Sequence, residues 1–225
     1  ATESGLPIDL RYRNSTDAVA ALSRGESDLA GFHVPTGEFE APSAERFGKW
    51  LDARSHRLIH LAYRTQGLFV NNGNPLGIQG LADLARADVR FVNRQVGSGT
   101  RMLLELMLPT CAIAPSTING YENTEFTHSA VAAFIASGMA DVGFGVQTAA
   151  ERFKLDFIPL ARERYFLAVN AESLDQPGMR KVIEVVRSNS FRDAVHQLAG
   201  YDATDTGEIL TLAQAFSSTP RKHAA

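Results

Sequence analysis

The residues best suited to chemistry lie close together, in the segment Arg90-Phe-Val-Asn-Arg-Gln-Val-Gly-Ser-Gly-Thr-Arg101. Ser98 and Thr100 are good N-cap residues for a following helix, and the two glycines of this corner allow a tight turn. A helix N-terminus presents unpaired N–H groups and a partial positive charge, which suit an anion. Arg94 and Arg101 add guanidinium groups that match carboxylates and oxyanions. We therefore predict an anion-binding corner, although an ordinary strand-to-helix turn with surface arginines would share this pattern.

Further donor side chains are candidates for the same ligand. A site rich in N–H and O–H donors and poor in carboxylates favours a small anion. Each candidate also has a simpler explanation: hydroxyls as N-caps, histidines bonded to backbone groups, Arg94 and Arg101 solvated or paired with Glu105, and a tyrosine that only packs. The predicted ligand-binding residues are Ser15, Thr16, His33, Gln66, Arg94, Ser98, Gly99, Thr100, Arg101, Thr127, His128 and Tyr165, and Arg64 and Gly145 are expected beside them.

The same residues do not form a pattern typical of catalysis or metal binding. Gly97-Ser98-Gly99 lacks the Gly-x-Ser-x-Gly elbow, and no P-loop lysine follows the glycines. His60 and His128 have no cysteine or second histidine at metal-ligand spacing. We therefore expect no catalytic residue, no metal site, no cofactor and no enzymatic activity.

The composition limits the class of protein. The chain has 225 residues, and 44% of them are hydrophobic, which is enough for a substantial core in one large domain or two lobes. The net charge of −3 argues against a nucleic-acid-binding surface on this chain. No apolar run approaches the ~20 residues that span a bilayer. We expect a soluble, cytoplasmic protein that does not bind membranes.

Strands and helices are predicted to alternate along the chain, which indicates an α/β fold with largely parallel sheets. The last seven residues, 219–225, are expected to fray, and an apolar patch at 209–212 has no clear place in this scheme. The predicted strands are 7–13, 28–34, 57–63, 67–71, 89–92, 117–121, 141–146, 156–160 and 164–169. The predicted helices lie within 14–25 and at 44–53, 81–85, 100–108, 129–137, 148–153, 178–187 and 191–198.

A weak internal repeat suggests two similar lobes. Ser15-Thr-Asp-Ala-Val-Ala-Ala-Leu, followed by Gly25-x-x-Asp28-Leu-Ala-Gly-Phe, resembles Thr127-His-Ser-Ala-Val-Ala-Ala-Phe followed by Gly138-x-x-Asp141-Val-Gly-Phe. Each copy reads as a capped helix, a glycine, an aspartate and a buried strand. Because ligands of open α/β sheets bind outside the carboxyl ends of the strands, we expect the ligand in a cleft between the lobes.

Several of these stretches resemble the periplasmic-binding-protein-like domain family that is joined to transcription regulators and molybdopterin-biosynthesis proteins. The resemblance covers about residues 7 to 170, and its most specific part is Asn93-Arg-Gln-Val-Gly-Ser-Gly-Thr-Arg101. It implies a two-lobed type II binding-protein fold like that of LysR-type effector domains, each lobe a mostly parallel sheet flanked by helices. By analogy, lobe I comprises residues 1–63 and 165–225, and lobe II comprises 64–164. Family members usually begin with an additional strand and helix, which we expect to be absent or altered here.

The resemblance implies a ligand-sensing effector domain of a bacterial transcription regulator. Its partner would be a small anion such as molybdate, tungstate or another oxyanion or carboxylate. DNA would be contacted only through a separate N-terminal domain, and the regulator would be a homo-oligomer. Two alternatives stay open: an extracytoplasmic solute-binding protein of an anion ABC importer, and an accessory domain of a molybdopterin-biosynthesis enzyme.

Overall fold

The computed structural model describes residue 5 and residues 7–216, so the expected fraying of 219–225 lies outside the described residues. The chain forms two compact units. Unit 1 comprises residues 1–63, 164–197 and 201–225, and unit 2 comprises residues 64–163 and 198–200. Two long strands, β2 (His56–Val70) and β6 (Asp156–Asn170), contribute to both units.

Unit 1 contains the chain ends and the last part of β6. A short 3-10 helix, η1 (Gly37–Phe39), precedes its second helix, and another, η5 (Ala171–Ser173), follows β6. The other elements are α1 (Ser15–Ser23), β1 (Leu29–Pro35), α2 (Glu40–Phe47), α6 (Pro177–Arg187), α7 (Asn189–His196), β7 (Tyr201–Asp202), β8 (Ile209–Leu210) and α8 (Leu212–Ala215).

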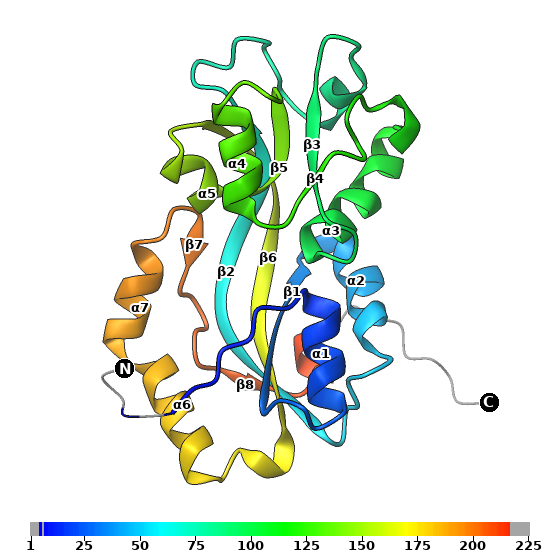
Figure 1. Ribbon diagram of the computed structural model, residues 1–225. Helices are drawn as coiled ribbons and strands as arrows, with labels where there is room; N and C mark the ends of the chain where they lie inside the picture. Colours follow the sequence, from blue (N-terminus) through cyan, green and yellow to red (C-terminus); the bar gives the residue numbers. More distant parts are fainter. Residues whose placement is uncertain (1–4, 6, 217–225) are drawn as a thin grey trace, which may run out of the picture. The chain divides into compact units, whose positions relative to one another are not determined.

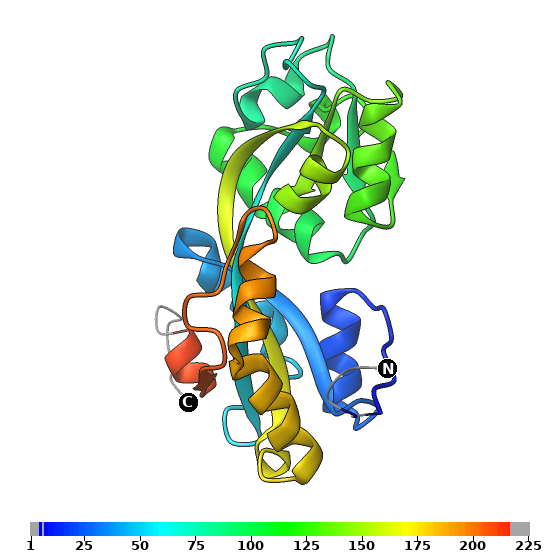
Figure 2. The ribbon, with the colours of Figure 1, turned by 90° about the vertical axis from the view of Figure 1, so that its left-hand side faces the viewer.

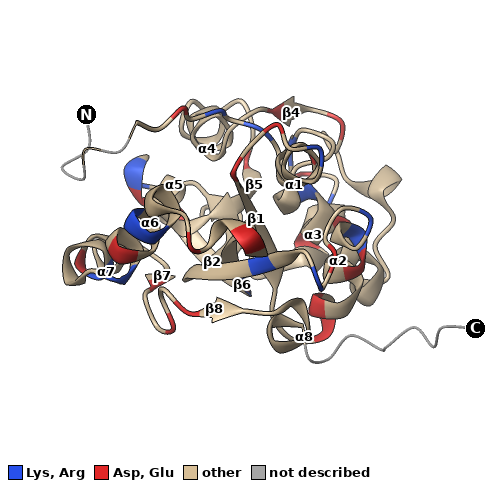
Figure 3. Cartoon of the chain, turned by 90° about the horizontal axis from the view of Figure 1, so that it is seen from below, with Lys and Arg blue, Asp and Glu red and all other residues tan. Residues whose placement is uncertain are grey.

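The core of unit 1 has two faces. On one face, α1, α2 and α8 surround an aromatic cluster in which the ring of Phe32 lies 4.7 Å from Phe47 and 5.8 Å from Phe166. On the other face, α6 packs Met179 and Ile183 against β2 and β6, and Figure 2 shows α6 and α7 running along these strands. Charged residues of both signs are interspersed along α6 and α7 (Figure 3).

Unit 2 contains one α/β sheet with helices on both sides. Its first elements are the end of β2, the 3-10 helix η2 (Leu81–Ala85), β3 (Phe91–Arg94) and α3 (Gly99–Met107). The 3-10 turns η3 (Leu108–Cys111) and η4 (Pro115–Thr117) follow, and then β4 (Thr124–Glu125), α4 (His128–Ala136), β5 (Val142–Val146), α5 (Gln147–Arg152) and the start of β6. In Figure 1, α4 and α5 lie on one side of β5 and β3, and α3 lies on the other.

The sheet of unit 2 is mixed. β3 pairs in parallel with both β4 and β5, as expected for strands connected through helices. β2 instead runs antiparallel to β5, with Gln66 opposite Val146 and Val70 opposite Val142. Val131 and Ile135 of α4 pack on Val92 of β3 in the main core cluster, so α4 is anchored to the sheet by a buried apolar face.

In two places the sequence predicted a pair of strands where the structure has one long strand. Residues 57–63 and 67–71 belong to the continuous β2, and 156–160 and 164–169 belong to β6. The polar residues Arg64-Thr-Gln66 and Arg162-Glu163 looked like breaks in the apolar pattern, but extended backbone also carries buried charged side chains that are paired, as Arg64 and Glu163 are here. The unplaced patch at 209–212 forms β8, which pairs with β2, and the start of α8.

Two other predicted elements are wrong, and a third has wrong bounds. Residues 7–13 form no strand, and Ile8, Leu10 and Tyr12 are exposed, because no described strand pairs with this segment and its alternation buries nothing. The helix predicted at 44–53 is α2, which ends before Gly48. Residues 117–121 are turns, because the positive φ of Gly120 (+90°) is incompatible with extended backbone.

Candidate functional site

The candidate site lies in unit 2, at the carboxyl edge of the parallel strands. β3 ends at Arg94, β4 ends at Glu125, and α3 and α4 begin shortly after these two strands. A backbone hydrogen bond from the Gln95 N–H to the Glu125 carbonyl (3.2 Å) holds the two connecting loops together. Ligands of α/β sheets bind at this kind of edge, because helix N-termini converge there.

The α3 N-terminus is built by the Gly-Ser-Gly-Thr corner. Gly97 has a φ of +82°, which lets the chain turn after the strand, and Ser98 is the N-cap. The Ser98 hydroxyl accepts a hydrogen bond from the Arg101 N–H at 3.2 Å. The N–H groups of Gly99 and Thr100, the first two residues of the helix, have no carbonyl within the helix to bond and are suited to an anion.

The α4 N-terminus is capped in the same way. The hydroxyl of Thr127 accepts a hydrogen bond from the Ala130 N–H at 2.9 Å, so α4 begins at His128. Thr127 is exposed and His128 is partly buried, with its Nδ1 atom buried and without a hydrogen-bond partner among the described residues. Burial holds the pKa of His128 well below its usual value, and the charges of Arg94 and Arg64 lower it further.

Arg94 is the central cation of the site. Its side chain is 9% exposed, its Nη2 donates to the Phe126 carbonyl at 2.9 Å, and its buried Nε has no partner among the described residues. Burial, followed by repulsion from Arg64, lowers its pKa to about 10. The guanidinium is therefore still charged at pH 7, and no carboxylate of the described residues pairs with it. A buried donor without an acceptor is unfavourable by itself and is suited to hydrogen-bond a bound anion.

Gln66 and the buried ion pair of Arg64 and Glu163 are the remaining polar groups of the candidate site. Gln66 is fully buried on β2, opposite the last residue of β5, and neither atom of its amide has a hydrogen-bond partner among the described residues. Two residues earlier, the Nε of Arg64 donates to the Glu163 carboxylate at 2.8 Å. Gly145 leaves room for the imidazole, because a Cβ there would lie 2.7 Å from the Nδ1 of His128.

Arg101 does not share the environment of Arg94. Its guanidinium pairs with Glu105 at 3.1 Å and Glu122 at 3.5 Å, and it lies over the Tyr121 ring at 4.8 Å from the centroid. These contacts hold the loop after η4, which carries Tyr121 and Glu122, against α3. Of the two arginines in the corner, Arg94 is the one without an acidic partner in the part of the chain that the structure describes.

Four of the predicted ligand residues belong to unit 1. Ser15 is the buried first residue of α1, and Thr16 follows it. The cap of this helix is Asn14, whose side chain accepts from the Asp17 N–H at 2.8 Å, so neither hydroxyl serves as the N-cap. His33 stacks on Tyr165 with ring centroids 4.1 Å apart.

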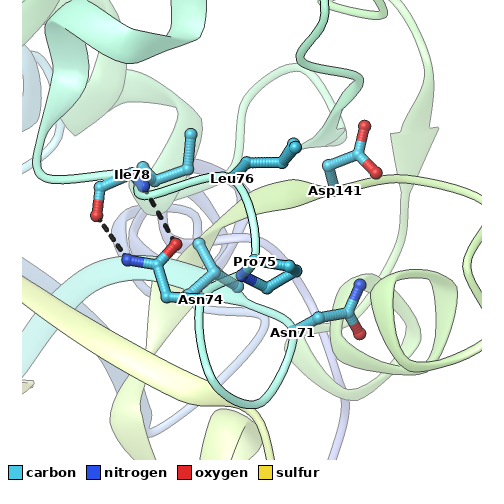
Figure 4. Close-up of a pocket in the computed structure, with 7 residues that line it drawn as sticks. Asn71, Asn74, Pro75, Leu76, Ile78 and Asp141 are labelled. Atoms are coloured by element: carbon cyan, nitrogen blue, oxygen red, sulfur yellow. Dashed lines mark hydrogen bonds between the residues drawn. The ribbon is translucent and has the colours of Figure 1, made fainter.

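Unit 2 also has a small pocket at the opposite edge of its sheet (Figure 4). It is lined by Val70, Asn71, Asn74, Pro75, Leu76, Ile78 and Asp141. Asn74 closes the turn beside it by exchanging two hydrogen bonds with Ile78, of 2.7 and 2.9 Å. Its volume of about 20 Å³ suits a single water, so this pocket is too small to be the ligand site.

Sequence analysis missed the role of Glu163. The signal was Glu163 and Arg64, each part of a short polar run (Arg162-Glu-Arg164 and Arg64-Thr-Gln66) between the apolar stretches of an extended segment. Buried charges of this kind need a partner, but nothing in the sequence indicates that these two, 99 positions apart, are paired. In the part of the chain that the structure describes, no helix is long and apolar enough to cross a bilayer, and no three potential ligands among His, Cys, Asp and Glu are grouped for a metal.

The comparisons agree with this architecture. The model of the PBP superfamily domain matches residues 1–187, so the chain belongs to this family. The substrate-binding protein of a phosphate ABC transporter from Clostridium perfringens, solved with bound phosphate, has a TM-score of 0.60 and 12% identity, with 84% of each chain covered. The regulatory domain of CcmR from Synechocystis PCC6803, solved in complex with 2-PG, has a TM-score of 0.56 and 17% identity, with 81% of this chain and 83% of that chain covered. The predicted type II periplasmic-binding-protein-like α/β fold is thereby confirmed.

A more similar relative by sequence is the uncharacterized protein YvgK of Bacillus subtilis. It is 34% identical over 203 residues, which cover 89% of this chain. The chain spans 64% of the length of YvgK.

Proposed function

We propose that this protein binds a small anion at the carboxyl edge of the unit 2 sheet. The observation that carries the proposal is Arg94, a buried and charged guanidinium whose Nε has no acceptor among the described residues. α3 begins at Gly99, five residues after it, and His128 and Gln66 add buried polar groups that have no partner among the described residues. Buried polar groups are normally hydrogen-bonded, so several orphaned donors near one edge favour a ligand that supplies the acceptors. The protein would bind without catalysing a reaction.

The role that we propose is that of a cytoplasmic sensor: the effector domain of a bacterial transcription regulator. The fold of the CcmR regulatory domain supports this role. DNA would then be contacted by a separate segment, and a homo-oligomer would match paired half-sites. The fold of a phosphate transporter's substrate-binding protein supports the alternative, a solute receptor of an anion importer. A winged-helix segment upstream in the coding sequence would favour the sensor, and a signal peptide would favour the receptor.

Isothermal titration calorimetry of the whole chain tests anion binding directly. The panel would contain molybdate, tungstate, sulfate, phosphate, formate and longer carboxylates at constant ionic strength. Replacing Arg94 with Met removes a buried charged donor, and we expect a loss of affinity of roughly 100-fold, because charge-assisted hydrogen bonds in desolvated sites contribute 2–5 kcal/mol.

The matched control is Arg90→Met. Arg90 directly precedes the same strand but lies at its opposite end, where its side chain is half exposed and paired with Asp141 at 2.8 Å. The control should bind within about twofold of the wild type, since exposed ion pairs contribute little. Equal affinities of the wild type and Arg94→Met, or no binding of any anion by the wild type, would overturn the proposed function.

A further inference from the structure

The two loops that flank Arg94 each carry an apolar side chain in solvent. Val96 lies in the loop between β3 and α3, and Phe126 lies in the loop between β4 and α4. Val96 is 72% exposed and Phe126 is 74% exposed, and these are the two most exposed large hydrophobic residues of the described part of unit 2. A single exposed apolar residue is common on a protein surface, but a pair beside a buried cation is a feature of ligand sites.

The fold uses the backbone of these loops and not their apolar side chains. The Gln95 N–H donates to the Glu125 carbonyl at 3.2 Å, which joins the two loops through main-chain atoms. Phe126 contributes its carbonyl to the Nη2 of Arg94, while its ring extends into solvent. Because polar residues would support the same backbone contacts, the apolar character of Val96 and Phe126 has no structural explanation in unit 2 itself.

Both apolar side chains lie close to the proposed anion position. The hydrogen bond of 2.9 Å from Arg94 to the Phe126 carbonyl places the backbone of Phe126 directly beside the guanidinium. Val96 and Phe126 each follow one member of the hydrogen-bonded pair Gln95 and Glu125, so the two residues lie on neighbouring loops at the same edge of the sheet. A group attached to an anion at Arg94 would therefore be within reach of both.

We propose that the ligand is an organic anion with an apolar body, and that Phe126 and Val96 bind this body while Arg94 and the helix N-termini bind the anionic head. This inference rests on the proposed anion-binding function and narrows its ligand class. A free inorganic oxyanion would use only the polar part of the site. An apolar body packed on the two side chains removes apolar surface of both partners from water, and an aromatic body also stacks on the Phe126 ring.

The test uses two pairs of anions that share a head and differ in the body: acetate with benzoate, and inorganic phosphate with phenyl phosphate. Each would be titrated calorimetrically into the whole chain at pH 7.5 and constant ionic strength. In at least one pair, we expect the wild type to bind the phenyl compound about 10-fold or more tightly than the small anion, because burying about 60 Å² of apolar surface is sufficient for a tenfold gain.

Substitutions of the apolar residues should remove this preference and leave binding of the head intact. In Phe126→Ser, we expect the affinities within the pair to agree within about threefold and the affinity for the small anion to stay within about twofold of the wild type, since the Phe126 carbonyl is retained. Val96→Ser should reduce the preference by about threefold, because its side chain is smaller.

The matched control is Met139→Ser. Met139 is also an exposed hydrophobic residue of unit 2, at 55%, but it follows Gly138, whose carbonyl accepts from Arg90 at the opposite edge of the sheet. The control should keep the wild-type preference for the phenyl compound.

Three results would overturn the inference while leaving anion binding intact. The first is a wild type that binds each small anion at least as tightly as its phenyl counterpart, and this result needs no variant to fold. The second is a Phe126→Ser protein that retains the full preference or loses affinity equally for both members of a pair. The third is a change from dimer to monomer in sedimentation with an unchanged preference, which would assign Phe126 to a contact between copies of the chain. If no member of either pair binds the wild type, the proposed function itself fails.

Discussion

The two arginines of the glycine-rich corner should respond to the same substitution in opposite ways. Both are buried, both lie within eight positions of each other, and both would lose a guanidinium on replacement by Met. Arg94 has a charge without an acidic partner among the described residues, whereas Arg101 has two acidic partners and an aromatic ring. We expect Arg94→Met to lose affinity and keep stability, and Arg101→Met to lose stability and keep affinity.

The expected change in the free energy of unfolding in Arg94→Met follows from the pKa of Arg94. Burial and the nearby Arg64 lower this pKa by more than two units from the usual value of an arginine, to about 10. At about 1.4 kcal/mol per unit, keeping the charge in the folded protein costs about 3 kcal/mol. The hydrogen bond to the Phe126 carbonyl offsets about 1.5–3 kcal/mol of this cost. Removing both should leave the free energy of unfolding of the ligand-free protein unchanged or raise it by up to about 2 kcal/mol.

In Arg101→Met, the expected change in the free energy of unfolding has the opposite sign. Its partners Glu105 and Glu122 are 38% and 81% exposed, so each ion pair contributes at most about 1 kcal/mol. The contact with the Tyr121 ring contributes about 1 kcal/mol more. Because the two glutamates stay solvated after the substitution, the expected loss in the free energy of unfolding is about 2 kcal/mol.

Urea denaturation of the ligand-free proteins and calorimetric titration of the folded ones measure the two effects separately. The wild-type chain is the common reference, and the unfolding slopes must agree for the comparison to hold. A loss of more than about 2 kcal/mol in Arg94→Met would show that Arg94 supports the fold. An Arg101→Met protein that folds stably but binds 100-fold more weakly would refute the structural role of Arg101, which is to hold the Tyr121–Glu122 loop against α3.

Two further predictions concern pH and close packing. His60 is fully buried beside Tyr63 and Phe166, and burial lowers its pKa from 6.5 to about 4. As the pH falls, His60 is therefore protonated in the unfolded chain before it is protonated in the folded protein. Its contribution to the free energy of unfolding is complete above pH 6.5 and falls by about 2 kcal/mol by pH 5. In His60→Phe, urea midpoints at pH 7 and pH 5 should differ correspondingly less than in the wild type, and an identical pH dependence would contradict this. Gly145→Ala places a Cβ 2.7 Å from His128, and it should destabilise unit 2 by about 1–3 kcal/mol and weaken anion binding. Gly143→Ala, which meets Val131 at 2.5 Å instead, should destabilise similarly without a specific loss of affinity, so equal losses in the two variants would speak against a site at His128.

Much of the fold follows from local sequence. Capped helix starts, glycine turns and apolar strands predicted most elements of unit 2, because caps and turns depend on neighbouring residues alone. Ser98 and Thr127 act as N-caps as predicted, and the Gly-Ser-Gly-Thr corner leads into α3. The segment 7–13 shows the limit of this approach, since alternation predicts a strand only where a neighbouring strand supplies the hydrogen bonds.

The assignment of charges depended on tertiary structure. Sequence alone identified both Arg94 and Arg101 as donors for an anion, and it could not distinguish them. Within residues 7–216, folding places two glutamates beside Arg101 and none in an ion pair with Arg94, and it pairs Arg64 with Glu163 across 99 positions of sequence. A residue type determines which charge a side chain can carry, but only the packed chain determines how well that charge is desolvated and which opposite charge lies within a few ångströms.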